Sequence, residues 1–365
     1  NSTEFGLFVA NFHSRLPLID AITPTGPINP AVVTGTASAL TQSQLIPGMI
    51  ANGVPAQVAP AAASGLISAA FAGVPQEAIN ASPVLGGVAP FYPSAQNIVS
   101  GAGQVGLFTA AGTARYFLEY PEDIFMIGGS FNTDLGNTGI AWQGEVSYKQ
   151  DVPLQVDDVE ILFAALSTLN PGFGAHNQVG NYFGQYGQII RGWRSHDVVT
   201  AQTTFTKIFG PTLGADSFTV VGEIGGLWAD IPPPDVLRYE VAGTYTSGSQ
   251  AAMDAVGGGL PATPTNFFAD DFAWGYRILA RLEYNNLFAG VNVLPTVSWG
   301  HDVSGNSPAP LSNYLEGRNS LSVSADFVFQ NRWTFNLQYV GYSGGGVQNL
   351  LGDRDFFSST LKFSF

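Results

Sequence analysis

Charged side chains are scarce in this sequence, and the basic ones are the rarer kind. Charged residues make up 11% of the chain, whereas a typical globular domain has about a quarter. Lys and Arg together number 13 against 27 acidic residues, which gives a formal net charge of −14. A chain so poor in basic residues lacks the electrostatic footprint for binding nucleic acid or an anionic membrane surface. We therefore expect no nucleic-acid partner.

Cysteine and long apolar runs are both absent. Zero Cys excludes disulfides and suits an exported protein that does without them. Although 45% of the residues are hydrophobic, no window offers the roughly 18 uninterrupted apolar residues of a membrane-spanning helix. The chain starts at Asn1 without Met, a basic segment or an apolar leader. We expect that a signal peptide has been removed or that an N-terminal part is absent.

The C-terminal residues alternate strictly between polar and apolar side chains, from Thr360 to Phe365. A period of two is the spacing of a half-buried β-strand. In an outer-membrane barrel the apolar face of such a strand meets lipid, and its polar face meets the lumen. A terminal strand of alternating aromatics that ends in Phe also resembles the signal that bacterial outer-membrane proteins offer to their assembly machinery.

Comparable strand patterns recur along the chain. We predict ten strands, at 4–15, 123–133, 139–150, 190–209, 216–230, 271–285, 289–300, 318–330, 333–342 and 354–365. Their connections alternate between short and long. The short ones lie near 134–138, 210–215, 286–288 and 330–332, and the long ones are 16–122, 151–189, 231–270, 301–317 and 343–353. With a periplasmic C-terminus, every short turn lies in the periplasm and every long loop outside, as in bacterial barrels.

These patterns predict an all-β fold, a transmembrane antiparallel β-barrel in the bacterial outer membrane. We expect about ten strands in this chain, long extracellular loops and short loop helices, all in a single domain over 1–365. Trp142 and Trp333 fall at the inner strand ends and the other four Trp at the outer ends. That distribution is typical of two aromatic girdles at the membrane interfaces. Pro295 falls within a strand, where we expect a local bulge.

Segment 16–122 has an unusual composition. From Ala21 to Ala114 only Glu77 is charged, and Ala, Gly, Pro, Ser and Val predominate. Segments 31–44 and 61–74 each fit a short Ala-rich helix. The segment is either a low-complexity surface loop or, as we prefer, an apolar, plug-like insert. In the second case it packs on itself, folds into the lumen, or lies at the membrane surface to receive an apolar molecule.

Charged side chains within the strands are predicted to face the lumen. They are Glu145, Lys149, Glu223, Arg277, Arg281, Glu283, Asp326 and Lys362. One interpretation is that they pair across strands and stiffen the wall. The other is that they form a polar interior that sets a passage or anchors a plug. Both can hold at once.

A second set of polar residues is predicted at the mouth, where strands meet long loops. It comprises His13, Arg15, Asp157, Asp158, Glu160, His196, Asp197, His301 and Asp302. The two His-Asp pairs fit either a metal site or, more simply, hydrogen-bonded rim residues. The three acids at 157–160 fit a Ca²⁺ site, but a helix N-terminus, which favours acidic residues, is the simpler interpretation.

No sequence pattern points to catalysis. The chain has no Gly-x-Ser-x-Gly elbow, no phosphate-binding loop and no dinucleotide fingerprint. Four His and no Cys give no recognisable zinc spacing. We therefore predict no catalytic residue, no cofactor and no metal, and we do not expect an enzyme.

Several stretches resemble the outer-membrane proteins of domain-of-unknown-function family 1302. They are Asn11–Pro17, Arg115–Ile124, Ser130–Thr133, Pro153–Glu160, His301–Pro308 and Asp353–Phe356, and they are collinear with that family. Members of the family tend to be longer, so the resemblance implies further strands in a full protein. It also implies a periplasmic or lipoprotein partner and an inner-membrane transporter of the resistance-nodulation-division (RND) type, with lipids or other hydrophobic molecules as cargo.

Two functions follow as hypotheses. The first is a passive channel or conduit for hydrophobic or amphipathic small molecules or lipids, in which segment 21–114 forms a binding or gating element. The alternative is a structural anchor in the outer membrane whose loops bind another protein. An outer-membrane enzyme is the least favoured class. In each case outer-membrane lipid surrounds the barrel.

Overall fold

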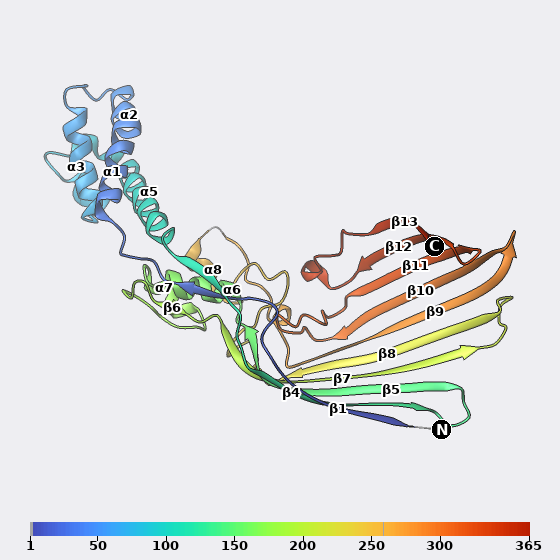
Figure 1. Cartoon of the computed structure of the whole chain (residues 1–365). Coiled ribbons are helices and arrows are strands. Elements are labelled where there is room, and N and C mark those ends of the chain that lie inside the picture. The colour runs from blue at the N-terminus through green and yellow to red at the C-terminus, as the bar shows by residue number, and fades with distance from the viewer. Residues whose placement is uncertain (1–2, 258) are drawn as a thin grey trace.

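A ten-stranded antiparallel sheet dominates the fold. In the computed structural model, which describes residues 3–257 and 259–365, the strands follow the order β1-β4-β5-β7-β8-β9-β10-β11-β12-β13 (Figure 1). They are β1 (Glu4–Phe12), β4 (Ile124–Asp134), β5 (Ile140–Gln155), β7 (Trp193–Phe209), β8 (Ser217–Ala229), β9 (Phe272–Phe288), β10 (Val291–Ser304), β11 (Asn319–Phe329), β12 (Trp333–Ser343) and β13 (Phe356–Phe363). Each of the ten predicted segments supplies one of these strands. The prediction of an all-β, antiparallel fold is confirmed.

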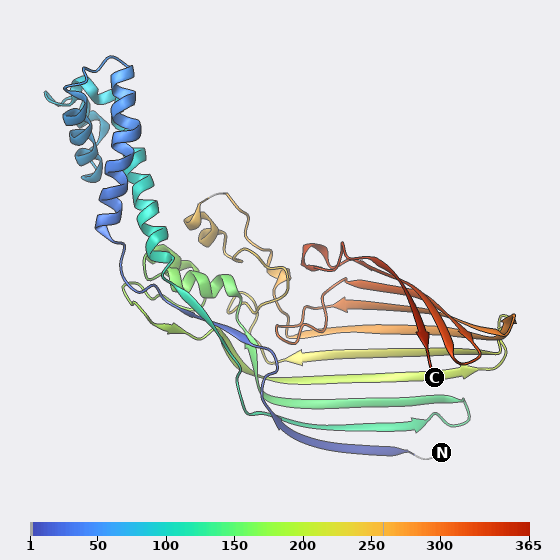
Figure 2. The same cartoon turned by 45° about the horizontal axis from the view of Figure 1, so that its top comes forward.

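The sheet is curved, and among the described residues it is open. β1 pairs only with β4 and β13 only with β12, so each has one unpaired edge. Figure 2 shows these two edges apart, with the other strands following the curve between them. The structure thus shows a large sheet and not the closed barrel that was predicted.

Within the described residues, no helix combines the length and the apolar character needed to cross a membrane.

The pairing register gives the sheet one apolar and one polar face. One cross-strand row of the apolar face, with side chains 41–68% exposed, consists of Val297, Val323, Tyr339 and Phe357. The adjacent row, on the polar face, consists of Thr296, Ser324, Gln338 and Ser358. Because side chains alternate along a strand, a slip of one residue would reverse both faces. The alternating sequence therefore fixes the register.

Short and long connections lie at opposite ends of the strands. Ala289 and Gly290 join β9 to β10, and their φ angles of 48° and 79° suit a two-residue hairpin turn. Figure 1 shows the short turns and both termini at one end, which we call the turn end. The long connections lie at the other, which we call the loop end. The predicted alternation of short and long connections is confirmed.

The predicted bulge at Pro295 is wrong. Pro295 pairs with Ala325 of β11 in an unbroken register. The pairing of β10 with β9 also keeps the same register before and after Pro295. The nearest irregularity in that pairing lies between Val291 and Val293. A proline that lacks one ladder hydrogen bond is thus accommodated without an extra residue.

A second, small sheet lies at the loop end. Its central strand β2 (Leu18–Ile22) pairs antiparallel with β3 (Arg115–Glu119) and with β6 (Ile189–Ile190). Outside the two sheets and segment 16–122, the remaining elements are α6 (Asp158–Leu166), α7 (Pro171–His176), α8 (Gln250–Val256), η3 (Thr265–Phe267) and η4 (Gly346–Gln348). One buried core, which includes Leu154, Ile190, Leu227 and Tyr239, joins this sheet to the ends of the large strands.

Segment 16–122 is not the low-complexity surface loop that was one interpretation of its sequence. Between β2 and β3 it forms α1 (Pro30–Leu40), η1 (Thr41–Leu45), α2 (Ile46–Ala51), α3 (Ala59–Phe71), α4 (Gln76–Asn80), η2 (Gly86–Phe91) and α5 (Tyr92–Ala111). We call residues 30–111 the helical bundle. The predicted helices at 31–44 and 61–74 correspond to α1 and α3.

The helical bundle has a core of its own. Met49, Leu66 and Tyr92 are fully buried in it, and the Tyr92 hydroxyl donates to the carbonyl of Val74 at 2.5 Å. Figures 1 and 2 show the bundle beyond the loop end of the strands, outside the curve of the sheet. The segment therefore packs on itself and does not fill the space that the sheet encloses.

Candidate functional site

The polar face of the sheet collects the charged residues that were assigned to the strands. Glu145 shares a row with Gln202 and Gly225, and Glu223 shares one with Arg277. The register places all eight on this one face: Glu145, Lys149, Glu223, Arg277, Arg281, Glu283, Asp326 and Lys362. Period-two counting in the sequence was sufficient to group them.

Three of these residues, Glu223, Glu283 and Asp326, accept hydrogen bonds from side chains of the neighbouring strand. Glu223 accepts from Thr204 at 3.1 Å, and Asp326 accepts from Asn336 at 2.8 Å. Arg277 instead pairs with Asp302 at 2.8 Å. In the part of the chain that the structure describes, no two of the eight form an ion pair with each other. Stiffening by charge pairing among the eight is therefore not what the structure shows.

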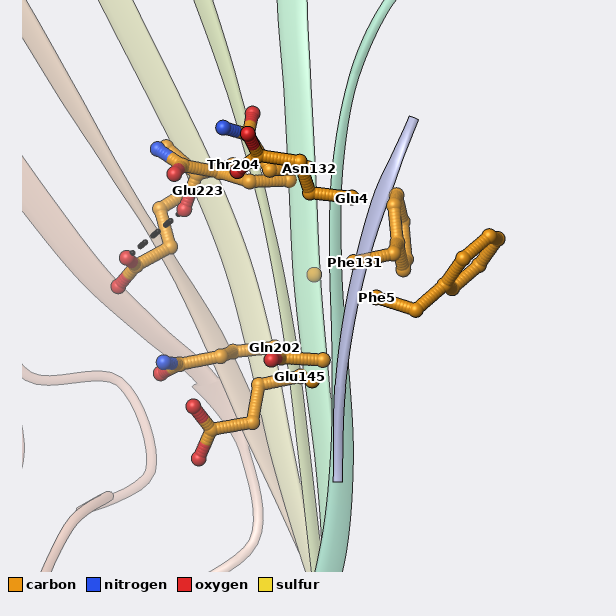
Figure 3. Close-up of a pocket in the computed structure, with 12 residues that line it drawn as sticks. Glu4, Phe5, Phe131, Asn132, Glu145, Gln202, Thr204 and Glu223 are labelled. Carbon is orange, nitrogen blue, oxygen red and sulfur yellow. Dashed lines mark hydrogen bonds between the residues drawn. The ribbon is translucent and has the colours of Figure 1, made fainter. Parts of the chain in front are cut away.

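A hollow of about 530 Å³ opens on the polar face near β1. Figure 3 shows Glu145, Gln202 and Glu223 directed to the same side of the strands, and Phe5 and Phe131 directed to the other. Glu4, Glu145 and Glu223 line the hollow, and no Lys or Arg is among its lining residues. This part of the face is therefore acidic.

The two His-Asp pairs are held separately at the loop end. His196 donates through Nδ1 to the carbonyl of Asp230, and its Nε2 accepts from the Tyr239 hydroxyl. Asp197 accepts from the Tyr148 hydroxyl at 2.6 Å. These contacts fit a hydrogen-bonded rim and leave neither nitrogen of His196 free for a metal.

In the second pair, His301-Asp302, the aspartate makes the polar contacts. It is 1% exposed and binds Arg277 through Oδ1 at 2.8 Å and Arg318 through Oδ2 at 2.7 Å. His301 points to the other face, where its ring stacks on Trp299 with centroids 6.0 Å apart. Asp302 thereby joins β9, β10 and the connection after β10.

His13 and Arg15 lie just beyond β1. His13 Nδ1 accepts from the backbone N–H of Asp123 at 3.3 Å, and the Arg15 side chain is exposed. The structure gives neither residue a contact with the two His-Asp pairs.

The acids at the start of α6 are arranged differently from the predicted trio. Glu160 is fully buried, and it accepts from Arg238 at 2.9 Å and from Ser247 at 2.9 Å. Among the described residues, the one group of acidic or His side chains close enough to share an ion is Asp157, Asp158 and Glu240, with ligand atoms within 4.8 Å of one another. The predicted Glu160 is thus replaced by Glu240, which is distant in sequence.

Burial raises the pKa of all three carboxyls in this group. It raises the pKa of the Glu240 carboxyl to about 7, and it raises the pKa of Asp157 well above its usual range. Asp157 also caps α6, because its Oδ2 accepts from the backbone N–H of Glu160 at 3.3 Å. The helix-capping interpretation of Asp157 thus agrees with the structure.

The small sheet contains a further acidic contact that the sequence did not indicate. Asp20 is 1% exposed and accepts from the backbone N–H of Gly192 at 2.6 Å. Burial raises the pKa of Asp20 to about 6, and the neighbouring Glu119 adds to this shift, while Arg191 opposes it. Glu119 accepts from Trp193 Nε1 at 2.8 Å, and this bond lowers its pKa.

The raised pKa of Asp20 predicts a pH-dependent stability. A carboxyl with a raised folded-state pKa stabilises the fold below its unfolded pKa, and that stability is lost as pH rises through about 6. Asp20→Asn keeps an acceptor for Gly192 and should reduce this loss by on the order of 2 kcal/mol. The measurement is urea-induced unfolding at pH 4.5 and 7.5, with the exposed Glu122→Gln as control. Identical pH dependence in wild type and Asp20→Asn would contradict the prediction.

The helical bundle carries a groove that sequence reasoning missed. Its volume is about 340 Å³, and it is lined by Leu40, Gln44, Leu45, Gly48, Phe91, Ser94, Asn97 and Ile98. The lining combines aliphatic and aromatic side chains with amide and hydroxyl groups. Helical periodicity in the Ala-rich stretches could have suggested the helices, but the groove arises from residues about 50 positions apart.

One family matches the chain over residues 1–365, and its description is "Protein of unknown function (DUF1302)". No curated protein matches the chain. The resemblance found in the sequence motifs is confirmed by this full-length match.

Proposed function

Since the chain belongs to the DUF1302 family of proteins of unknown function, we propose a function for it from its faces and its groove. The protein is a conduit in the bacterial outer membrane for hydrophobic or amphipathic small molecules or lipids. The large sheet forms barrel wall, with its apolar face toward lipid and its polar face toward the lumen. The helical bundle receives the cargo, and the conduit works with a periplasmic or lipoprotein partner and an RND-type inner-membrane transporter.

The observation that carries the proposal is the continuous apolar face of the sheet. Val146, Ile224 and Val323 lie on it in three different strands and are 50%, 50% and 44% exposed. Exposing such a face to water is unfavourable by about 25 cal/mol per Å². Hydrocarbon removes this penalty, and transmembrane strands of about 9–11 residues suffice to cross it. Eight of the ten strands are 11 residues or longer, and the others have nine and eight.

The unpaired edges favour closure into a barrel. A flat exposed edge invites aggregation, and membrane sheets avoid it by closing, because lipid offers no hydrogen bonds to free N–H and C=O groups. The edges of β1 and β13 are the two that must find partners. Closure would enclose the polar face, and the acidic hollow beside Glu145 and Glu223 would then line the passage.

The groove on the helical bundle supports an amphipathic cargo. Its volume of about 340 Å³ lies within the range of about 300–1,000 Å³ that small-molecule sites occupy. Phe91, Leu45 and Ile98 offer apolar contacts, whereas Gln44 and Asn97 offer amide hydrogen bonds. This mixture suits a molecule with an apolar body and a polar group.

Filling the groove tests the proposal. A Cβ on Gly48, which lines the groove, would meet no atom within 4 Å. The backbone there has room for the start of a side chain, and we expect the indole ring of Gly48→Trp to block the groove. We expect uptake of the apolar probe N-phenyl-1-naphthylamine by cells expressing the protein to fall several-fold in this variant. Deletion of residues 30–111 should reduce uptake to that of cells without the protein.

Gly35 provides a matched control, because it lies on α1 outside the groove and is equally free of neighbours. Gly35→Trp should leave uptake unchanged. If the deletion variant reached the outer membrane and still took up the probe normally, the receiving role of the bundle would be wrong. A stoichiometric protein partner with no probe uptake at all would instead favour the structural anchor.

A further inference from the structure

Three carboxylates from two chain segments converge at the loop end, next to the start of α6. Val156 and Tyr239 form an antiparallel bridge there, and the backbone N–H of Asp157 donates to the carbonyl of Arg238 at 3.0 Å. The backbone N–H of Glu240 donates to the carbonyl of Gln155 at 2.9 Å. This bridge brings one ligand atom each of Asp157, Asp158 and Glu240 within 4.8 Å of one another.

One carboxyl oxygen of this group has no hydrogen-bond partner in the part of the chain that the structure describes. Asp157 is fully buried, and its Oδ2 is used by the cap of α6. Its Oδ1 has no hydrogen-bond partner. Leaving a buried acceptor unsatisfied is unfavourable by about 1–3 kcal/mol, and more when the group is charged. An unpartnered oxygen next to two further carboxyls is therefore stabilised either by a shared proton or by a bound cation.

Among the described residues, no hydrogen-bond donor reaches Asp157 Oδ1. Arg238, on the same bridge, binds Glu160 through Nη1 at 2.9 Å, and its Nε has no hydrogen-bond partner among the described residues. The backbone N–H of Asp158 donates to Glu240 Oε2 at 3.1 Å, and the Thr244 hydroxyl donates to Glu240 Oε1 at 3.2 Å. These donors are directed at Glu240 and leave Asp157 Oδ1 open.

We propose that Asp157, Asp158 and Glu240 bind a divalent cation of the calcium class. All three donors are oxygen atoms of carboxylates, which hard cations prefer, and the group contains no nitrogen or sulfur ligand. Asp158 is exposed, so an ion and its remaining water ligands can reach the site from solvent. The ion joins the junction between β5 and α6 to the connection between β8 and β9, and so fixes two of the long connections at the loop end.

The test uses the purified full-length chain in detergent, free of lipopolysaccharide. We expect one Ca²⁺ per chain in equilibrium dialysis, and a higher unfolding temperature in CaCl₂ than in EDTA. Asp158→Asn removes an exposed ligand, and should weaken Ca²⁺ binding at least tenfold without preventing folding. Asp235→Asn changes an exposed acid on the same connection as Glu240 and should leave binding unchanged.

Two results would overturn the proposal. The first is an unfolding temperature that is the same in CaCl₂ and EDTA, as expected if a shared proton holds Asp157 and Glu240 together. The second is an equal loss of Ca²⁺ binding in Asp158→Asn and Asp235→Asn, which would indicate nonspecific attraction to the acidic surface. Neither result depends on transport, so the test is independent of the proposed conduit.

Discussion

Val323→Arg is expected to destabilise the lipid-inserted protein by about 3 kcal/mol, because a guanidinium near the middle of a lipid-facing strand must leave water for hydrocarbon. Val323 lies at the centre of β11, on the apolar face, and is 44% exposed. The measurement is urea-induced unfolding after reconstitution into phospholipid vesicles, together with the yield of folded protein in the outer membrane.

Ser324→Arg is the matched control, since Ser324 is the next residue of the same strand and lies on the polar face. It should insert with nearly normal yield, because its side chain faces water in the proposed lumen. If both variants lost stability equally, or if Val323→Arg had no effect in vesicles, the assignment of the apolar face to lipid would be wrong.

Asp302→Ala is expected to destabilise the fold by about 3 kcal/mol, since it leaves two guanidinium groups without their counter-ion. Asp302 is almost fully buried, and it also accepts from the backbone N–H of Leu315 at 3.2 Å. The loss should appear in unfolding temperature and in early proteolysis of the connection 305–318, which Arg318 and Leu315 anchor to Asp302.

Asp326→Ala serves as the comparison, because Asp326 accepts one hydrogen bond, from the uncharged amide of Asn336 on the same sheet, and has no ion pair within the described residues. Its loss should destabilise the protein by only about 1 kcal/mol. Similar values for the two variants would show that Asp302 does not organise the loop end.

The large sheet could be predicted because its signals are local. Successive side chains of a strand point to opposite faces, so Val323 and Ser324 of β11 lie on opposite faces independently of the rest of the fold. The turn at Ala289 and Gly290 is likewise decided by two residues. The eight charged residues of the polar face were grouped by counting alone, since two strand faces are the only choices that a side chain has.

The helical bundle was predictable only in part. Asn29 caps α1 by accepting from the backbone N–H of Ala31 at 2.9 Å, and Pro30 follows at the first turn, both of which are helix-start signals. α5 escaped prediction because it contains several Gly, which disfavour helices. Close packing of α5 against α1 explains why residue 106 is a glycine, since a Cβ there would lie 2.5 Å from Cγ2 of Val33 on α1.

By itself the sequence determined the strands, their two faces and the alternation of short and long connections, because each depends on neighbours a few residues apart. Tertiary structure alone decided that β2 pairs with β3 across the whole bundle, that Glu240 and not Glu160 joins Asp157 and Asp158, and that Asp302 binds two arginines. These contacts join residues up to about 100 positions apart. No local sequence pattern indicates these long-range contacts, because they form only when the long connections fold over the ends of the strands.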